Sequence, residues 1–370
     1  MTEERNETMQ QGKKRKTRSA WPVMILMFVV ALLIFALIIL AGKLLKYQNH
    51  TVGVNTIPSE TGYSKEQMDA EVARAVESAE KRAREEGMSE GRKTVLEYLQ
   101  RELSLGNALL NTLRPLYPNE LIMVSGGAYH FVPVSDTLKK HTYRQENLRV
   151  DADSGLFSYY EGEQLISHKG IDVSKHQGKI DWTRVAGDGV EFAFIRVGNR
   201  GYGSAGRLVE DEYADENMTG ASQAGIPFGV YFFTQAITEE EILEEANFVL
   251  DKIKDYEVKL PVVIDVEKVT PADGRMNALS VEKRTDLVEL FCKTVEQAGY
   301  RPMIYHNMET GVLMLEPDRL EQYDKWFASY SEELYYPYEY KIWQYSPKGR
   351  VDGIDTDVDL NISFSRFWEE

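Results

Sequence analysis

The sequence predicts an α/β protein whose C-terminal part, residues 166–370, folds as a (β/α) barrel of the TIM type. Apolar runs of strand length alternate with helical patterns from Gly170 onward, and eight such strand candidates can be counted. Acidic residues follow directly on several of these runs. A chain of 370 residues, of which 43% are hydrophobic and 28% charged, can build this domain and additional segments before it.

The first of these segments is an uncharged apolar run at residues 21–42, WPVMILMFVVALLIFALIILAG. About 20 such residues cross a bilayer as a helix, so we expect a transmembrane helix. A cluster of five Lys or Arg at residues 13–18 lies just before the run, and only Lys43 and Lys46 follow closely, which predicts a cytoplasmic basic tail at residues 1–20. A cleaved signal peptide would have a shorter core and a small-residue cleavage site. A buried core helix would have a polar face.

Residues 43–117 carry helical patterns and are expected to form a stalk. Apolar residues recur at three- and four-residue steps, at Met68, Val72, Ala75, Ala79 and Ala83. We expect Gly87 and Gly91 to interrupt this helix, and a second one over residues 94–113 to end before Pro115. The pattern suits a solvated spacer or a stalk that self-associates, and is too broken to assign a coiled coil.

Residues 118–165 are predicted to form a small β-rich module. Short β-prone runs at 121–124, 128–134 and 156–160 alternate with turn signals such as Gly126-Gly127. Nothing in this segment points to a ligand, so we expect a structural collar.

The expected barrel consists of eight strands with helices between several of them. The strand candidates are Ile171–Val173, Phe192–Val197, Phe228–Phe233, Val262–Val266, Met303–Tyr305, Trp326–Tyr330, Ile342–Tyr345 and Val358–Ile362. Residues 238–254 and 280–298 have the periodicity of amphipathic helices.

Charge and composition exclude several classes of function. The net charge is −16, with residues 1–46 carrying +5 and the remainder −21, and so acidic a body argues against nucleic-acid binding. The single cysteine, Cys292, excludes an intrachain disulfide and is expected to be a buried thiol. The six histidines show no paired metal-ligand spacing, so no metal site and no cofactor are expected.

The acidic residues at the strand ends are the candidate catalytic groups. Asp265 and Glu267 follow the apolar run 260–264, and residues i and i+2 of a strand share a face at a Cα separation of about 6.5–7 Å. Their repulsion should raise the pKa of one carboxyl, so that an acid and an anion lie side by side, as glycosidic cleavage requires. Asp172 and Asp359 lie in the first and last strands. Aromatic residues at other strand ends could bind sugar rings: Tyr231, Phe232, Tyr305, Trp343 and Tyr345.

Seven blocks, in order, resemble one known family. They are GIDVSKHQGKIDW (170–182), FAFIRVGNRGY (192–202), AGIPFGVYFFTQA (224–236), PVVIDVE (261–267), RTDLVELFCKTVEQAGYRPMIYHN (284–307), IWQYS (342–346) and VDLN (358–361). The region from about Gly170 to Phe364 is similar to the family 25 glycoside hydrolases, bacterial and phage-type muramidases (lysozymes) that cut peptidoglycan. Residues 1–165 lie outside this resemblance.

The resemblance implies a role for each cleft acid. It makes Glu267 the general acid and Asp265 its partner, which either attacks the anomeric carbon or steadies a neighbouring 2-acetamido group. Asp172 and Asp359 match the family's other two cleft acids, which tune charge and hold substrate.

The sequence therefore predicts a membrane-anchored, extracytoplasmic muramidase of the bacterial cell envelope. Its substrate would be the β-1,4 bond between N-acetylmuramic acid and N-acetylglucosamine, cut for local wall remodelling. Two alternatives stay open: a non-catalytic peptidoglycan-binding scaffold, and a barrel hydrolase of another N-acetylated glycan such as chitin.

Overall fold

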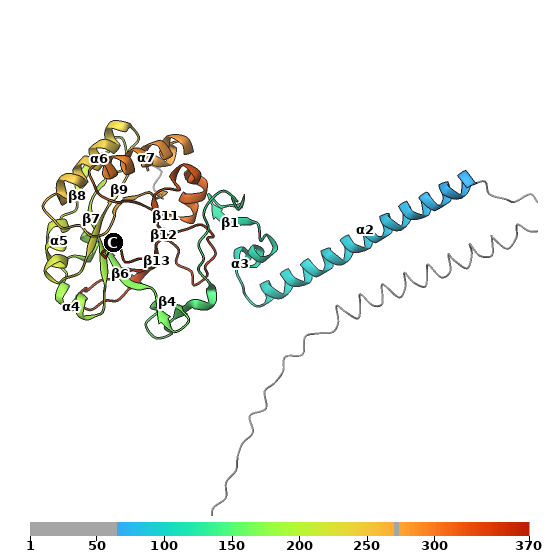
Figure 1. The fold of residues 1–370 in the computed structure, drawn as a ribbon, viewed down its shortest axis with the longest axis horizontal. Helices are drawn as coiled ribbons and strands as arrows, with labels where there is room; N and C mark the ends of the chain where they lie inside the picture. The colour runs from blue at the N-terminus through green and yellow to red at the C-terminus, as the bar shows by residue number, and fades with distance from the viewer. Residues whose placement is uncertain (1–64, 270–273, 370) are drawn as a thin grey trace, which may run out of the picture. The chain divides into compact units, whose positions relative to one another are not determined.

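The computed structural model describes residues 65–269 and 274–369, and its main feature is a closed barrel (Figure 1). The sheet order is β6-β14-β13-β12-β11-β10-β9-β7, and β7 pairs back with β6 to close it. The strands are β6 (His168–Val173), β7 (Phe192–Arg200), β9 (Phe228–Phe233), β10 (Val262–Asp265), β11 (Pro302–Asn307), β12 (Asp324–Ala328), β13 (Ile342–Gly349) and β14 (Val358–Ser363). Each strand overlaps one predicted candidate, so the barrel is confirmed. A short strand, β8 (Leu208–Glu210), extends the sheet beside β7.

The last strand departs from the expected TIM pattern. Seven of the barrel strands run parallel, but β14 is antiparallel to both of its neighbours, β13 and β6. Parallel pairing needs a crossover of about a dozen residues or more, and the link 350–357 between β13 and β14 is shorter. This end of the barrel therefore closes by antiparallel pairing.

Helices cover the outside of only part of the barrel. They are α4 (Trp182–Gly187), α5 (Ala214–Gln223), α6 (Glu239–Ile253) and α7 (Val281–Gln297). The helices α6 and α7 lie where the periodicity predicts them, and the side chains of Thr238 and Ser280 cap their first turns. Short 3-10 and π turns, η5 (Thr310–Met314) and η6 (Pro317–Leu320), link β11 to β12, and no helix is described between β12 and β13. The strand–helix repeat is thus incomplete, and the predicted TIM regularity holds only for the first half.

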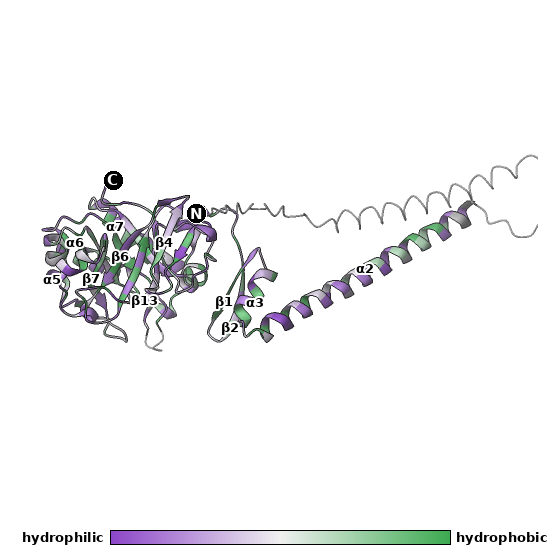
Figure 2. Cartoon of the chain, turned by 90° about the horizontal axis from the view of Figure 1, so that it is seen from below, coloured by the Kyte–Doolittle hydropathy of each residue, from purple (hydrophilic) through white to green (hydrophobic). Residues whose placement is uncertain are grey.

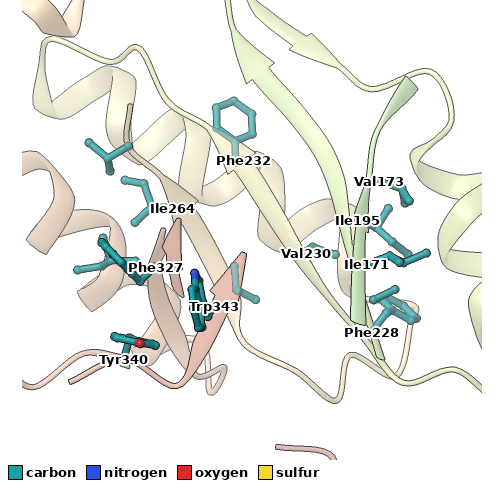
Figure 3. Close-up of a cluster of buried hydrophobic side chains, with 14 of the residues drawn as sticks. Ile171, Val173, Ile195, Phe228, Val230, Phe232, Ile264, Phe327, Tyr340 and Trp343 are labelled. Carbon is teal, nitrogen blue, oxygen red and sulfur yellow. The ribbon is translucent and has the colours of Figure 1, made fainter. Parts of the chain in front are cut away.

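Side chains alternate between the inside and the outside of the barrel, which creates two apolar layers. Phe192 and Phe194 point inward with Met303, Trp326 and Ile342. The outer layer packs under the helices and connections, and Figure 3 shows part of it: Ile171, Ile195, Phe232, Ile264 and Trp343. This alternation decides which residues of each strand can reach the barrel mouth.

Residues 118–165 contain five short strands that pack on the outside of the barrel. A hairpin of β1 (Glu120–Ser125) and β2 (Ala128–Pro133) is followed by the sheet β3 (Leu148–Val150), β4 (Phe157–Glu161) and β5 (Gln164–Leu165). Phe157 stacks on Tyr345 with ring centroids 4.2 Å apart. Leu121 and Met123 of β1 belong to the same buried cluster as the outer barrel layer. These strands therefore share the core of the barrel.

The first helix that the structure describes is longer than the sequence indicates. α2 (Lys65–Ser104) runs through Gly87 and Gly91, so the predicted interruption is wrong. A glycine costs only about 1 kcal/mol in a helix interior, and the surrounding Ala, Glu, Lys and Arg outweigh it. The chain turns at Gly106, where φ is 83°, before the short helix α3 (Leu109–Leu113) and the 3-10 turn η1 (Arg114–Leu116).

The apolar residues of α2 are not covered. Described side chains from Asp69 to Glu97 are exposed, including Val72 and Val76, and hydrophilic and hydrophobic residues mix along the helix (Figure 2). The predicted transmembrane helix at residues 21–42 lies outside the described residues. Within the residues described, no helix combines the length and apolar character needed to span a bilayer.

Candidate active site

A cavity of about 330 Å³ opens at the barrel end where the parallel strands finish. All four predicted acids line it: Asp172, Asp265, Glu267 and Asp359. The chain therefore brings together side chains that are almost 190 residues apart in sequence.

Asp265 is the last residue of β10, and Glu267 follows directly after the strand. Asp265 is buried, and its Oδ1 atom has no hydrogen-bond partner among the described residues. A buried acceptor atom without a partner is costly, so Oδ1 is available for a group of the substrate. Asp265 and Glu267 point to the same side, as predicted, since both line one cavity.

Asp172 is held by two side-chain amides. Gln344 Nε2 and Asn361 Nδ2 each donate to Asp172 Oδ2 over 2.8 Å. The amides are themselves oriented, because Tyr305 and Tyr330 donate to Gln344 Oε1 and Trp326 Nε1 donates to Asn361 Oδ1. These bonds turn both NH₂ groups toward the carboxylate, and they favour its ionised form.

The pKa values of all four carboxyls are raised. Burial is the first cause in each case, with repulsion among the acids adding to it for Asp265, Glu267 and Asp359. Asp172 has a pKa of about 6, since burial raises it and the two amides oppose this, whereas the pKa of Asp359 is raised to about 8. The acids titrate as a set that keeps protons near neutral pH, and Asp172 ionises more readily than Asp359.

A hydrogen bond between Asp265 and Glu267 adds to these effects. It lowers the pKa of Glu267 and raises that of Asp265. The pair is therefore suited to share one proton, so that one carboxyl is an acid while the other is an anion. The repulsion predicted from the sequence is present, but burial is the larger cause.

One guanidinium, that of Arg196, also lines the cavity. Its charge is already paired, because its Nε and Nη2 atoms lie 2.8 and 2.7 Å from Asp211 Oδ2. Asp211 is buried and also accepts from the backbone amides of Lys175 and Tyr213. The charge of Arg196 therefore offsets only part of the rise in the pKa of Asp265, and the cavity keeps its acidic character.

Two of the five predicted sugar-binding aromatic residues line the cavity and three do not. Tyr231 and Tyr305 are at the cavity, together with Trp326, Tyr330, Tyr202 and Phe233. Trp343 and Tyr345 lie on the outer face of β13, where Trp343 Nε1 donates to the carbonyl of Ser329 and Tyr345 stacks on Phe157. Their predicted role in sugar binding is not supported by this position.

The alternation of side chains along a β-strand explains why Trp343 and Tyr345 do not line the cavity. Residues of β13 alternate, so Gln344 faces the cavity while its neighbours Trp343 and Tyr345 face outward. For the same reason Tyr231 faces the cavity and Phe232 belongs to the outer layer. A polar residue between two aromatic residues in the run IWQYS was the signal that could have identified Gln344. Arg196, Asn361 and Tyr330 were also missed, and only their spatial neighbours distinguish them.

Comparison with known proteins finds similarity to one family over the barrel region. Residues 171–354 match the family model described as glycosyl hydrolases family 25. The uncharacterized protein YegX of Escherichia coli K12 is 29% identical over 206 residues, which are 52% of this chain and 68% of YegX. Lysozyme M1 of Streptomyces globisporus is 25% identical over 206 residues, covering 52% of this chain and 66% of that protein.

Among solved structures, the modular autolysin LytC from Streptococcus pneumoniae is similar, with a TM-score of 0.48 and 23% sequence identity. The similarity covers 65% of this chain and 57% of the LytC chain. The matched family region includes three of the four cavity acids, and Asp359 follows shortly after its end.

Proposed function

Since residues 171–354 match the family model of glycosyl hydrolases family 25, we propose that this protein is a muramidase that hydrolyses the β-1,4 bonds between N-acetylmuramic acid and N-acetylglucosamine in peptidoglycan. The observation that carries the proposal is the buried pair Asp265 and Glu267 at the end of β10, within one acidic cavity. The similarity to a protein named lysozyme supports the choice of glycan.

In this proposal the proton that Asp265 and Glu267 share passes to Glu267, which donates it to the oxygen of the leaving sugar, and Asp265 is left as the carboxylate. The positive charge that develops at the anomeric carbon is met by the Asp265 carboxylate. The unpartnered Oδ1 atom of Asp265 favours an assisting role, because a carboxylate oxygen can accept the N–H of a neighbouring 2-acetamido group. A water molecule then completes hydrolysis, with Glu267 taking back a proton.

The test compares wild-type protein with Glu267→Gln on purified peptidoglycan. We expect Glu267→Gln to lower the release of reducing ends by at least about 100-fold, because the general acid is lost. Mass spectrometry of the released muropeptides identifies the bond that is cut. Full activity of Glu267→Gln would refute the assignment of the acid. Wild-type protein that binds peptidoglycan without shortening it would favour the scaffold function, and cleavage of chitin alone would favour another glycan.

The cellular setting is also part of the proposal. Residues 21–42 anchor the chain in the membrane with residues 1–20 in the cytoplasm, and the enzyme acts on nearby wall from the outer face. Replacing residues 1–46 with a cleavable signal should release active enzyme into the medium. If the cell-wall phenotype then stayed the same, tethering would have no part in the function.

We include self-association through residues 43–117 in the same proposal. The exposed residues Val72, Val76, Leu96 and Leu103 of α2 support it, since a partner helix would cover them. Sedimentation of the full chain in detergent should give a dimer or higher oligomer. A monomer at all concentrations would contradict this point and leave the enzymatic assignment unaffected.

A further inference from the structure

Ser125, Lys268 and Glu309 form a small cluster beside the catalytic strand. Lys268 Nζ lies 2.5 Å from Glu309 Oε1 and 3.0 Å from Ser125 Oγ. Ser125 Oγ also donates to Glu309 Oε1 over 2.5 Å. The three side chains come from three separate parts of the chain: the end of β1, the residue after Glu267, and the segment after β11.

The hairpin that supplies Ser125 is firmly positioned. Gly126 and Gly127 form its two-residue turn, and both have positive φ (58° and 78°), as a type I′ turn requires. The hydroxyl of Tyr335 accepts from the backbone amide of Ile122 over 2.7 Å, and it donates to the carbonyl of Glu120. The β1 strand is thus tied to the barrel, and Ser125 is held where it meets Lys268 and Glu309.

The cluster joins a segment outside the family match to the site itself. The hairpin precedes residues 171–354, whereas Lys268 is the chain neighbour of Glu267. An ammonium next to the acidic cavity would be attracted to its carboxyls. Glu309 and Ser125 instead hold it on the side of the hairpin. Partial burial raises the pKa of Glu309, but the hydrogen bonds from Lys268 and Ser125 outweigh this effect, so that the pKa of Glu309 is lowered.

We propose that the β1–β2 hairpin is a positioning element of the active site, in which Ser125 and Glu309 hold the Lys268 ammonium away from the acidic cavity and fix the chain at Glu267. This inference rests on the proposed function. A purely structural role explains the cluster less well, because partly exposed ion pairs of this kind contribute little to stability.

The charges around Glu267 decide what a released ammonium would do. The acids of the cavity are Asp172 from β6, Asp265 from β10 and Asp359 from β14, with the phenols of Tyr231, Tyr305 and Tyr330. The basic groups are Arg196, which is paired with Asp211, and His176 at the rim. His130 of the hairpin lies near Glu309. A free Lys268 would therefore favour the ionised form of the cavity acids.

The test uses full-length Ser125→Ala, Glu309→Gln and the double variant Glu309→Gln/Lys268→Met, assayed on peptidoglycan across pH. Glu239→Gln is the matched control, because it removes the partner of Lys283 in another partly exposed ion pair on α6 and α7. We expect Ser125→Ala and Glu309→Gln to lower kcat roughly 3–10-fold with KM within about twofold, since small displacements of a catalytic group reduce turnover. In Glu309→Gln, the basic limb of the pH profile should move about half a unit lower, and the double variant should restore it.

Values of kcat and a pH profile equal to those of wild type and Glu239→Gln would overturn the inference. An inactive wild type would instead refute the proposed function, and the positioning role would then be tested by thermal unfolding alone. The loss of Tm between pH 5 and pH 8 should be smaller in Glu309→Gln than in wild type and the double variant. Equal losses in all three proteins would overturn the positioning role.

Discussion

Asp359 lies directly opposite Asp172 in the antiparallel pairing of β14 with β6. Because β14 runs against the other barrel strands, its first residues are at the end where the parallel strands finish. Two carboxyls from the two ends of the domain thus become neighbours at the cavity. Their proximity, with burial, underlies the raised pKa of Asp359.

The set of carboxyls predicts a bell-shaped dependence of kcat/KM on pH. The acidic limb should have an apparent pKa of about 6, where Asp172 ionises, and the basic limb one of about 8, where Asp359 loses its proton. These are properties of the coupled set rather than of single residues. Initial rates at low substrate between pH 4 and pH 10 measure both limbs, and activity that rises steadily beyond pH 9 would contradict the prediction.

Stability should fall as the pH rises through the range in which the buried acids ionise. The folded-state pKa of Asp359, about 8, is above the ordinary value of 3.8, so the folded protein binds this proton more tightly than the unfolded chain. That contribution is full below pH 4 and is lost as the pH approaches 8. Asp359→Asn should therefore raise Tm at pH 8, by roughly 2–8 °C for a gain of about 1–2 kcal/mol, and leave it nearly unchanged at pH 4.

Calorimetry or fluorescence-detected unfolding at both pH values checks this prediction. Asp136→Asn serves as the control, since the Asp136 carboxylate is exposed and should shift Tm by less than a degree or so at either pH. A lower Tm for Asp359→Asn at pH 8 would show that Asp359 is stabilising as an anion, against our expectation.

Gln344→Met should impair the enzyme mainly at the acidic side of its pH range. The variant removes one of the two amide donors to Asp172, so the pKa of Asp172 should rise and the acidic limb should move to higher pH. We expect kcat/KM at pH 6 to fall about 10-fold, and less at pH 7.5. Gln145→Met, at a glutamine that bonds outside the cavity, is the matched control. An equal loss at both pH values would indicate a different role for Gln344.

The two classes of aromatic residue should respond differently to truncation. Trp343 is only 1% exposed and lies on the outer face of β13, so Trp343→Ala should destabilise the fold by about 3–5 kcal/mol. Tyr330 is 58% exposed and lines the cavity, so Tyr330→Ala should raise KM several-fold with little change in Tm. Denaturant unfolding and steady-state kinetics separate the two effects. A raised KM for a folded Trp343→Phe variant would contradict this prediction and indicate that Trp343 contacts the substrate.

The sequence alone determined the elements of the barrel and its main acids. Apolar runs bounded by turn signals placed all eight strands, because a buried strand must be apolar along its length. The run before Asp265 located the strand end at which two of the cavity acids lie, since polar side chains after a buried strand emerge at the barrel mouth. These inferences depend on local composition, which the sequence contains in full.

Tertiary structure decided what local pattern could not. The outward direction of Trp343 and Tyr345, the antiparallel direction of β14, and the bonds from Gln344 and Asn361 to Asp172 all depend on which strands are neighbours. The contact of Ser125 with Lys268 likewise joins residues that are 143 positions apart. Pairing and packing bring such groups together through contacts that no short stretch of sequence encodes. The acids were therefore predictable from the chain, whereas their protonation and their supporting residues were set only by the closed barrel.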